Sequence, residues 1–311
     1  MQKALHFDIP ANAKECTLHS RLSPLQLTNL QKVFWPDDGL TKRDLLLYYG
    51  SIAKVILPHL RNRAMVMKRY PNGISEKFFF MKRTPENRPE WIQTCTIPHR
   101  SGNIIDFPIA QDLRSLLWLV NLGCIDMNQW YATCDDVDRP DYLHFDLDPV
   151  PPATFDHVCD TALVVRDYFA QRGIETFPKT TGSRGIHIYI PIKRGPVQKD
   201  VWRVAKAVAQ SLAAEHPKLI TDVYRVANRP AGRVLVDYNQ NAWGRTLASV
   251  YSVRPRPGAP VSMPVLWNEV QKGIRIEDFD MRNAKKRIDK LGDLFHPLLL
   301  KKSGYALEKL Q

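Results

Sequence analysis

The segment Tyr142-Leu-His-Phe-Asp-Leu-Asp-Pro149 alternates between apolar and polar side chains. An extended strand would therefore carry an apolar face formed by Leu143, Phe145 and Leu147. Its opposite face would carry His144, Asp146 and Asp148. The pattern predicts a buried strand in the middle of a sheet, with two carboxylates converging on one point.

Two carboxylates on one strand face favour a metal site. A buried carboxylate is costly unless it is paired or binds a metal, and Mg²⁺ and Mn²⁺ prefer oxygen ligands. Asp-x-Asp is common on its own, however. Asp146 and Asp148 could equally be an acidic pair in a turn, with Pro149 ending the strand.

A third carboxylate, Asp237, ends the apolar run 234–236. It is the only acidic residue in a stretch that holds five arginines, namely Arg229, Arg233, Arg245, Arg254 and Arg256. Three carboxylates beside arginines predict phosphoryl chemistry with two metal ions, which activate an attacking hydroxyl and stabilise a leaving pyrophosphate.

The remaining periodic segments predict a mixed fold. Strand-like segments are 64–68, 77–81, 185–192 and 234–238, and helix-like segments are 41–56, 110–122, 153–172 and 197–214. Because they follow one another irregularly, we expect an α/β (α+β) fold with mixed or antiparallel central sheets flanked by helices. No linker or repeat divides the chain. We expect one domain over 1–311, with an N-terminal extension (1–26) and a C-terminal helical appendage (about 274–311).

Residues 179–190 join a glycine-rich turn to a strand. Gly182 and Gly185 let backbone N–H groups approach an anion, and further donors come from Thr181, Ser183 and Arg184. His187 lies on the strand face opposite its isoleucine neighbours. A glycine-rich turn is often only a turn and a strand histidine is often structural, but together they indicate a phosphate site.

Cations and aromatic rings alternate in residues 68–83. Nucleic-acid bases stack on aromatic faces while cations follow the phosphates, so this strip favours a nucleotide or nucleic-acid ligand. Phe78 and Phe80 could instead belong to the core, which would leave Phe79 exposed. Strand alternation turns at least one of the three rings outward.

Charge and composition narrow the class of protein. The 311 residues include 44 Lys and Arg against 32 Asp and Glu, a net charge of +12 with a pI near 9.5. Residues 131–160 carry eight acidic residues against one arginine, a net charge of −7, so the remainder carries +19. This distribution favours a polyanionic partner around a cation site, although a basic soluble protein with acidic loops would give the same sum.

Targeting and cysteine patterns bear on localisation. No apolar run is long enough to span a membrane, and the first residues lack the apolar stretch of a secretion signal, so we expect a cytoplasmic, nucleoid-associated protein without a membrane partner. The five cysteines are scattered and form no C-x-x-C pair. We expect reduced thiols, neither a disulfide framework nor a zinc site.

Several ordered motifs between Leu27 and Val270 resemble the archaeo-eukaryotic primase-polymerase family, in particular the polymerase domain of ligase D from DNA end-joining systems. The motifs are LTNLQKVFWPDDGLTKRDLLLYY (27–49), MKRYPNGISEKFFFMKR (67–83), LVNLG (119–123), YLHFDLDP (142–149), KTTGSRGIHIYIP (179–191) and GRVLVDYNQNAWGRTLASVYSVRPRPGAPV (232–261). Their combination is far more specific than any one of them, and it implies a primase-polymerase fold.

The resemblance also implies roles for individual residues. The catalytic carboxylates that hold two Mn²⁺ or Mg²⁺ ions would be Asp146, Asp148 and Asp237. The nucleotide contacts would be Lys68, Phe79, Phe80, Thr181, Gly182, Arg184, His187, Arg245 and Arg254. Lys32 and Lys42 match positions that bind the 5′-phosphate on the downstream side of a gap.

This sequence departs from the family's pattern at several positions. Thr181 and Arg184 stand where the family usually has Ser and Lys, which keeps the donor and the charge. Asn128 stands where a histidine is usual, and asparagine cannot be protonated. We hypothesise that His144, on the strand face of Asp146 and at a position that is usually apolar, partly replaces that histidine.

The resemblance implies a template-directed DNA-repair polymerase that acts in non-homologous end joining. It would add nucleotides, preferentially ribonucleotides, to primer 3′-ends at gaps and double-strand breaks, using NTPs or dNTPs on DNA with a 5′-phosphate. The chain has no K-x-D-G ligase motif, so we expect a separate polymerase module that works with a DNA ligase and the end-binding protein Ku in trans. Alternatives are a primase or gap-filling excision-repair polymerase of the same superfamily, and a non-catalytic module that bridges DNA ends.

Overall fold

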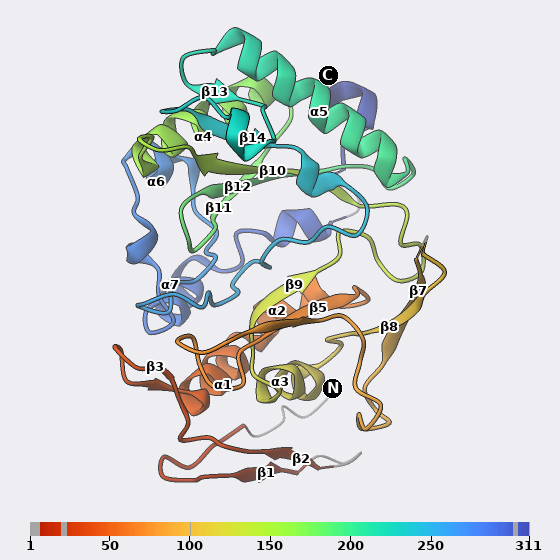
Figure 1. The fold of residues 1–311 in the computed structure, drawn as a ribbon, viewed down its shortest axis with the longest axis vertical. Coiled ribbons are helices and arrows are strands. Elements are labelled where there is room, and N and C mark those ends of the chain that lie inside the picture. The colour runs from red at the N-terminus through yellow and green to blue at the C-terminus, as the bar shows by residue number, and fades with distance from the viewer. Residues whose placement is uncertain (1–6, 20–23, 100, 301–303, 311) are drawn as a thin grey trace.

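The computed structural model describes residues 7–19, 24–99, 101–300 and 304–310. Two sheets face each other, and helices cover the outer side of each (Figure 1). Strand pairing is mostly antiparallel, so the predicted mixed α/β class is confirmed. Parts of the predicted N-terminal extension and C-terminal appendage lie outside the described residues.

The larger sheet has five strands in the order β11-β12-β10-β14-β13, which span Phe177–Thr180, Ile186–Pro191, Tyr142–Pro149, Val234–Asp237 and Ile220–Thr221. β10 is the middle strand. Its apolar face, formed by Leu143, Phe145 and Leu147, is fully buried, as predicted. The outer side of this sheet carries α4 (Phe155–Ala170), α5 (Gln198–Glu215) and α6 (Trp267–Gln271). The carboxylate face of β10 therefore turns toward the smaller sheet.

The smaller sheet has three strands in the order β6-β5-β9, which span Phe79–Met81, Met65–Arg69 and Cys124–Gln129. Its outer side carries α1 (Lys42–Ser51), α2 (Ala53–Leu60) and α3 (Leu113–Asn121). Thr41 begins α1 with a capping box, in which its backbone N–H donates to the Asp44 carboxylate at 2.8 Å. The single helix predicted over 41–56 is two helices, because the chain leaves helical geometry at Ile52.

The segment 249–265 joins the two sheets. On one side, the backbone N–H of Ser249 donates to the carbonyl of Met127 in β9 at 2.7 Å. On the other, the N–H of Thr180 in β11 donates to the carbonyl of Met263 at 2.9 Å. Backbone hydrogen bonds to both sheets fix the segment, and with it the side chains that it carries between them.

The remaining strands form two-stranded units: β1 (Cys16–Leu18) with β2 (Leu25–Leu27), β3 (Val33–Trp35) with β4 (Leu40–Thr41), and β7 (Thr94–Pro98) with β8 (Ile104–Pro108). The C-terminal part is less helical than its charge pattern suggests. It contains one α-helix, α7 (Ala284–Leu291), which ends at Gly292 with φ 72°. Its other described elements are short 3₁₀ turns, η3 (Ile276–Asp278), η4 (His296–Leu299) and η6 (Leu307–Leu310). No helix in the described part of the chain is long and apolar enough to cross a membrane.

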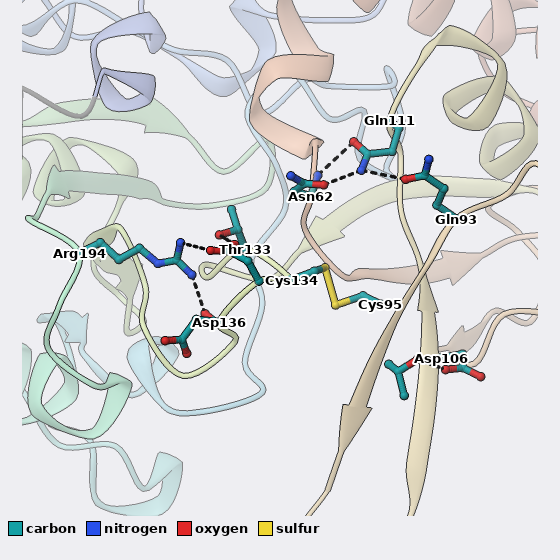
Figure 2. Close-up of a disulfide and its surroundings, with 11 residues drawn as sticks. Asn62, Gln93, Cys95, Asp106, Gln111, Thr133, Cys134, Asp136 and Arg194 are labelled. Carbon is teal, nitrogen blue, oxygen red and sulfur yellow. Dashed lines mark hydrogen bonds and ion pairs between the residues drawn. A yellow bond between two sulfur atoms is a disulfide. The ribbon is translucent and has the colours of Figure 1, made fainter.

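The expectation that all cysteines are reduced is wrong for one pair. Cys95 in β7 and Cys134 form a disulfide that ties the β7–β8 hairpin to the segment that leads into β10 (Figure 2). The two Cα atoms lie 5.8 Å apart although 39 residues separate them in sequence. Their proximity arises from a small apolar cluster around Ile97, Phe107 and Trp130, which cysteine spacing does not reveal. Cys16, Cys124 and Cys159 are free, as expected.

Candidate active site

The three predicted catalytic carboxylates lie together on the inner face of the larger sheet. Asp146 in β10 pairs directly across the sheet with Asp237 in β14, and Asp148 lies two residues further along β10 on the same face. Asp146 is 8% exposed and Asp237 is 4% exposed. Two distant segments therefore place three carboxylates in one small, largely dry region.

Burial and mutual repulsion disfavour the ionised forms of these carboxylates. Burial raises the pKa of Asp146 to about 6, although the nearby cations Lys179 and Arg254 act against it. Burial and the charge of Asp146 raise the pKa of Asp148 to about 6. The same two causes raise the pKa of Asp237. The nearby cations therefore do not offset the effects of burial and repulsion on these three carboxylates.

Different neighbouring groups contact Asp146 and Asp237. His187 Nε2 lies 3.2 Å from Asp146 Oδ1, and Lys179 Nζ lies 2.7 Å from the other ring nitrogen, Nδ1. Asp237 accepts hydrogen bonds from the backbone N–H of Asn239 at 2.8 Å and from Gln240 Nε2 at 3.0 Å. Within the described residues, no three His, Cys, Asp or Glu side chains converge closely enough to hold a metal ion as they stand.

The chemistry of the site nonetheless fits a divalent cation. Clustered, buried carboxylates offer the oxygen ligands that Mg²⁺ and Mn²⁺ prefer, and a cation would relieve the repulsion that raises their pKa values. Asp146, Asp148 and Asp237 are the residues that would hold it.

The glycine-rich turn lies beside these carboxylates, but its backbone N–H groups form hydrogen bonds within the turn. Three of its backbone N–H groups donate to Thr181 Oγ1 at 3.1–3.2 Å, those of Ser183, Arg184 and Gly185. They therefore do not point at open space as the sequence suggested, and the hydroxyl hydrogen of Thr181 and the exposed Arg184 remain as donors. Gly182 has a φ of +64°, and a Cβ there would lie 2.7 Å from Arg254 Cγ. The turn and Arg254 are thus in close contact.

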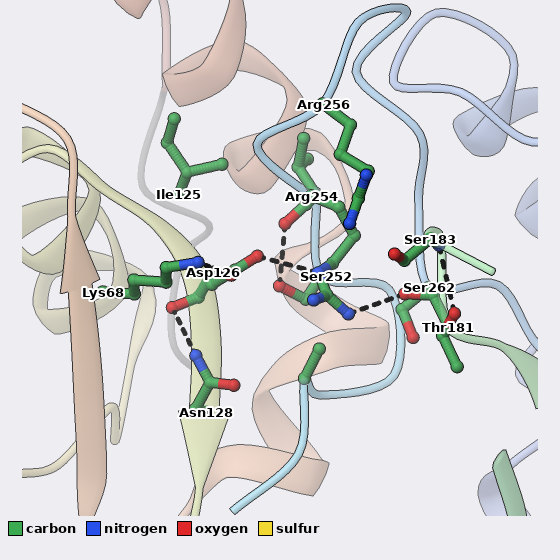
Figure 3. A network of polar contacts seen from close by, with 12 residues as sticks. Lys68, Ile125, Asp126, Asn128, Thr181, Ser183, Ser252, Arg254, Arg256 and Ser262 are labelled. Atoms are coloured by element: carbon green, nitrogen blue, oxygen red, sulfur yellow. Dashed lines mark hydrogen bonds and ion pairs between the residues drawn. The ribbon is translucent and has the colours of Figure 1, made fainter. Parts of the chain in front are cut away.

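Lys68 and Arg254 face each other between the two sheets (Figure 3). Both lie near the buried carboxylate of Asp126 in β9, at 3.9 Å for Lys68 Nζ and 3.0 Å for Arg254 Nε. Arg254 also donates from Nη1 to the carbonyl of Thr181 at 2.7 Å. Arg245, also predicted to bind nucleotide, is exposed in the loop after β14, and no contact among the described residues ties it to this group.

The three phenylalanines of the 78–80 run are all exposed. Phe78, Phe79 and Phe80 have exposed fractions of 47%, 45% and 63%, so the core interpretation of Phe78 and Phe80 is wrong. Lys68 Nζ lies over the Phe78 ring at 4.2 Å from its centroid. Arg69 lies over the Phe79 ring at 5.1 Å. The rings form an apolar surface edged with cations, which suits base stacking.

The two predicted 5′-phosphate residues lie side by side. The backbone N–H of Lys42 at the start of α1 donates to the carbonyl of Lys32 at 2.9 Å. The Lys32 ammonium is exposed and donates to Asn72 Oδ1, whereas Lys42 is 4% exposed and donates from Nζ to the carbonyl of Thr28 at 2.7 Å. Burial, the charge of Lys32 and that of Arg69 lower the pKa of Lys42 to about 8.

His144 does not fit the hypothesis that it replaces the histidine absent at Asn128. It is fully buried, and its ring packs 4.1 Å from the Tyr131 ring and 5.4 Å from the Tyr189 ring, centroid to centroid. Neither ring nitrogen has a hydrogen-bond partner among the described residues, and burial lowers its pKa well below the usual value. Although His144 shares the strand face of Asp146, a histidine that is fully buried among tyrosine rings cannot take over an acid–base or charged role at the site.

Three residues of the site escaped the sequence analysis: Asp126, Lys179 and Gln240. Lys179 and Gln240 lie inside recognised motifs and Asp126 lies three residues after one, but nothing in the local pattern distinguishes them. Lys179 is fully buried, a rare state for lysine, and Asp126 is 2% exposed. Burial of a charged side chain is a tertiary property, and so is the hydrogen bond of Gln240 to Asp237, so only the structure identifies these residues.

Comparisons with known proteins identify the family of this chain. The family model described as "LigD, primase-polymerase domain" matches residues 41–295. The multifunctional non-homologous end joining protein LigD of Mycolicibacterium smegmatis is 34% identical over 281 residues, covering 89% of this chain and 36% of that protein. The bifunctional LigD of Bacillus subtilis is 29% identical over 294 residues, covering 92% of this chain and 47% of that protein. The chain thus spans less than half the length of these relatives.

A solved structure gives the same result for the fold. The polymerase domain of Mycobacterium tuberculosis ligase D, solved in complex with DNA, is similar with a TM-score of 0.83 and 31% sequence identity. The match covers 88% of this chain and 98% of that one, which confirms the predicted primase-polymerase fold. With a family match over residues 41–295, a relative 34% identical over 89% of the chain and a similar solved fold, this chain belongs to the LigD primase-polymerase domain family.

Proposed function

We propose that this chain is a template-directed polymerase of non-homologous end joining, which adds nucleotides to primer 3′-ends at gaps and double-strand breaks. The observation that carries the proposal is the position of Asp146, Asp148 and Asp237 on one sheet face, opposite the partly exposed cations Lys68 and Arg254. Intact carboxylates favour an enzyme over a non-catalytic end-bridging module. The similar solved structure is a polymerase domain and the relatives are non-homologous end joining proteins, which supports the same conclusion.

The chemistry we propose is nucleotidyl transfer. Divalent ions bound to the three carboxylates would activate the primer 3′-hydroxyl and stabilise the leaving pyrophosphate. Lys68, Arg184 and Arg254 neutralise the triphosphate, and in a partly dry site such fixed charges act more strongly than in water. His187 orients the Asp146 carboxylate through Nε2. The exposed rings of Phe79 and Phe80 stack on the base or shape the template.

The substrates and partners that we propose follow from the same site and from the family. The substrate is gapped or broken DNA with a 5′-phosphate, which Lys32 and Lys42 recognise, and the preferred nucleotides are ribonucleotides. The DNA-bound state of the mycobacterial relative supports a DNA substrate. A DNA ligase and the end-binding protein Ku are the partners that would complete the repair.

Extension of a gapped duplex tests this function. The assay compares duplexes with and without the 5′-phosphate, ribo- with deoxyribonucleotides, and Mg²⁺ with Mn²⁺. We expect templated extension by the wild type, faster with ribonucleotides, with Mn²⁺ and with the 5′-phosphate, and no extension by Asp146→Ala or Asp237→Asn. Asp156→Asn is the matched control, because Asp156 lies in the same acidic part of the sequence but forms an exposed ion pair with Arg275.

Three outcomes would contradict the proposal. Extension by Asp146→Ala at the wild-type rate removes the metal assignment. A wild-type protein that binds DNA ends but extends no primer identifies an end-bridging module. Efficient synthesis on a template without any primer identifies a primase.

A further inference from the structure

Asp126 is a buried carboxylate that lies between two partly exposed cations. Its side chain is 3% exposed, whereas the side chains of Lys68 and Arg254 are 20% and 21% exposed. Each cation therefore has one side on Asp126 and another side open to a ligand. We propose that Asp126 is a positioning residue that holds Lys68 and Arg254 at a fixed spacing for the triphosphate of the incoming nucleotide.

The smaller sheet fixes the first cation. Lys68 lies in the middle strand β5, with Phe80 of β6 directly opposite on one side and Asp126 of β9 directly opposite on the other. Next to this pair the register shifts, because Ile125 is an extra residue in β9. Such a bulge re-aims the side chains beside it. Phe80, Lys68 and Asp126 thus form one row across the sheet.

The segment 249–265 fixes the second cation against the same strand. The backbone N–H of Met127, the residue after Asp126, donates to Ser252 Oγ at 2.9 Å. The N–H of Val253 donates to Tyr49 Oη at 3.0 Å, and that hydroxyl donates to the carbonyl of Ile125 at 2.7 Å. These bonds hold the backbone on the N-terminal side of Arg254 against β9. Its guanidinium then reaches Asp126 with Nε and the carbonyl of Thr181 with Nη1 (Figure 3).

The Asp126 carboxylate does not neutralise the positive charge of the site, because several cations surround it. Burial raises the pKa of Asp126, while the charges of Arg254, Lys68 and Arg256 act against that rise, so one carboxylate lies among three cations. A net positive charge remains for a polyanion. Without the carboxylate, Lys68 and Arg254 would repel each other, and Lys68 would lose the opposite charge that lies 3.9 Å from its ammonium group. Asp126 therefore sets the geometry of the cations and leaves their net attraction in place.

This inference rests on the proposed function, because it assigns the cations to an incoming nucleotide. The direction in which phosphate affinity changes when Asp126 is removed distinguishes this inference from a simple charge effect. Removing a negative charge near a phosphate site strengthens phosphate binding if charge alone matters. If Asp126 positions the cations, its removal weakens phosphate binding instead.

The test compares Asp126→Asn, Asp126→Glu and a control, Glu269→Gln. Glu269 also holds an arginine of another element, since Arg287 donates to it from two nitrogens, at 2.7 and 2.5 Å, but the pair joins α6 to α7. For each variant we measure thermal unfolding, nucleotide KM and kcat on a gapped duplex, and affinity for that duplex. Calorimetric binding of ATP and of inorganic tripolyphosphate isolates the phosphate contacts.

We expect Asp126→Asn to raise the nucleotide KM about ten-fold and to weaken tripolyphosphate binding equally, with kcat and DNA affinity changed less than two-fold. This pattern is typical of a lost interaction that is equally strong in the ground and transition states. Asp126→Glu keeps the charge but moves the carboxylate by one methylene, so KM should rise about three-fold. Glu269→Gln should lower the unfolding temperature without changing KM.

Specific outcomes overturn the inference. KM and tripolyphosphate affinity within two-fold of wild type in Asp126→Asn, or tighter binding, refute it. If Asp126→Asn does not fold, Asp126→Glu decides, and an unchanged KM in that variant refutes the inference. An equal rise of KM in Glu269→Gln reduces Asp126 to a general stability role. A wild-type protein that extends no primer refutes the proposed function, whatever the variants do.

Discussion

Gly182 is the position where a single added methyl group tests the contact between the glycine-rich turn and Arg254. Gly182→Ala places a Cβ 2.7 Å from Arg254 Cγ and 3.2 Å from the backbone nitrogen of Ser262. Gly173 provides a matched control, because its φ of +65° is nearly that of Gly182, +64°, and a Cβ there has no atom within 4 Å. The two substitutions therefore share the backbone strain and differ in the collision.

The expected magnitudes follow from these distances. An alanine in the left-handed region costs about 1 kcal/mol, which is the whole expected effect of Gly173→Ala. At Gly182, ordinary contact begins at 3.4 Å, so the Arg254 side chain must move by about 0.7 Å. That displacement stretches the 2.7 Å hydrogen bond from Arg254 Nη1 to Thr181 to as much as 3.4 Å and loses most of a charged hydrogen bond of about 2 kcal/mol. Gly182→Ala should thus lose about 3 kcal/mol of unfolding free energy.

The assay combines urea unfolding with nucleotide KM on a gapped duplex. We expect Gly182→Ala to raise KM about ten-fold, equivalent to about 1.4 kcal/mol of binding, and Gly173→Ala to leave KM unchanged. Equal unfolding free energies and equal KM values for the two variants would refute the reasoning, because the collision with Arg254 would then have no consequence.

Three further predictions follow from other parts of the structure. Replacing Cys95 and Cys134 by alanine opens a loop closed across 39 residues, and chain entropy predicts a loss of about 4 kcal/mol relative to the oxidised protein in guanidinium unfolding; Cys16→Ala is the control, and equal stability contradicts the cross-link. The pKa of Lys42 is lowered to about 8, so its ammonium loses its positive charge between pH 7 and 9. In binding titrations, the preference of the wild type for a gap with a 5′-phosphate should therefore decline over this range, whereas that of Lys42→Arg should persist. The free energy of unfolding should rise above pH 8, because the Lys42 ammonium holds its proton more tightly in the unfolded chain than in the folded one. Lys179→Met removes the contact that orients His187 and should raise the Mn²⁺ concentration for half-maximal activity several-fold, with nucleotide KM unchanged; a change in KM alone argues against that role.

The sequence predicted the central strand because its signal is local. The period-two alternation of residues 142–149 places Leu143, Phe145 and Leu147 on the buried face, and the structure confirms that face. It also aligned Asp146 and Asp148 on the opposite face. The cap at Thr41 is local too, since it depends on a hydroxyl and a carboxylate three residues apart. Where a motif is contiguous, side-chain direction follows from backbone geometry alone.

The sequence was less successful where an element depends on its neighbours. Phe78 and Phe80 could be core or surface residues in a segment of that composition, and the structure shows both exposed, Phe80 in the edge strand β6 and Phe78 directly before it. The helix predicted over 41–56 breaks at Ile52, although the apolar spacing continues. His144 shares a strand face with Asp146, yet the tyrosines around it bury it completely.

By itself, the sequence determined the mixed fold class, the carboxylates of β10 and the motifs that identify the family. Only the tertiary structure decided that Asp126 joins Lys68 to Arg254, that Lys179 is buried behind His187, and that Cys95 meets Cys134. The physical reason is the range of the interactions. Periodicity and capping act over a few residues, whereas these contacts join segments far apart in sequence, and strand pairing and apolar burial bring such segments together only in the folded chain.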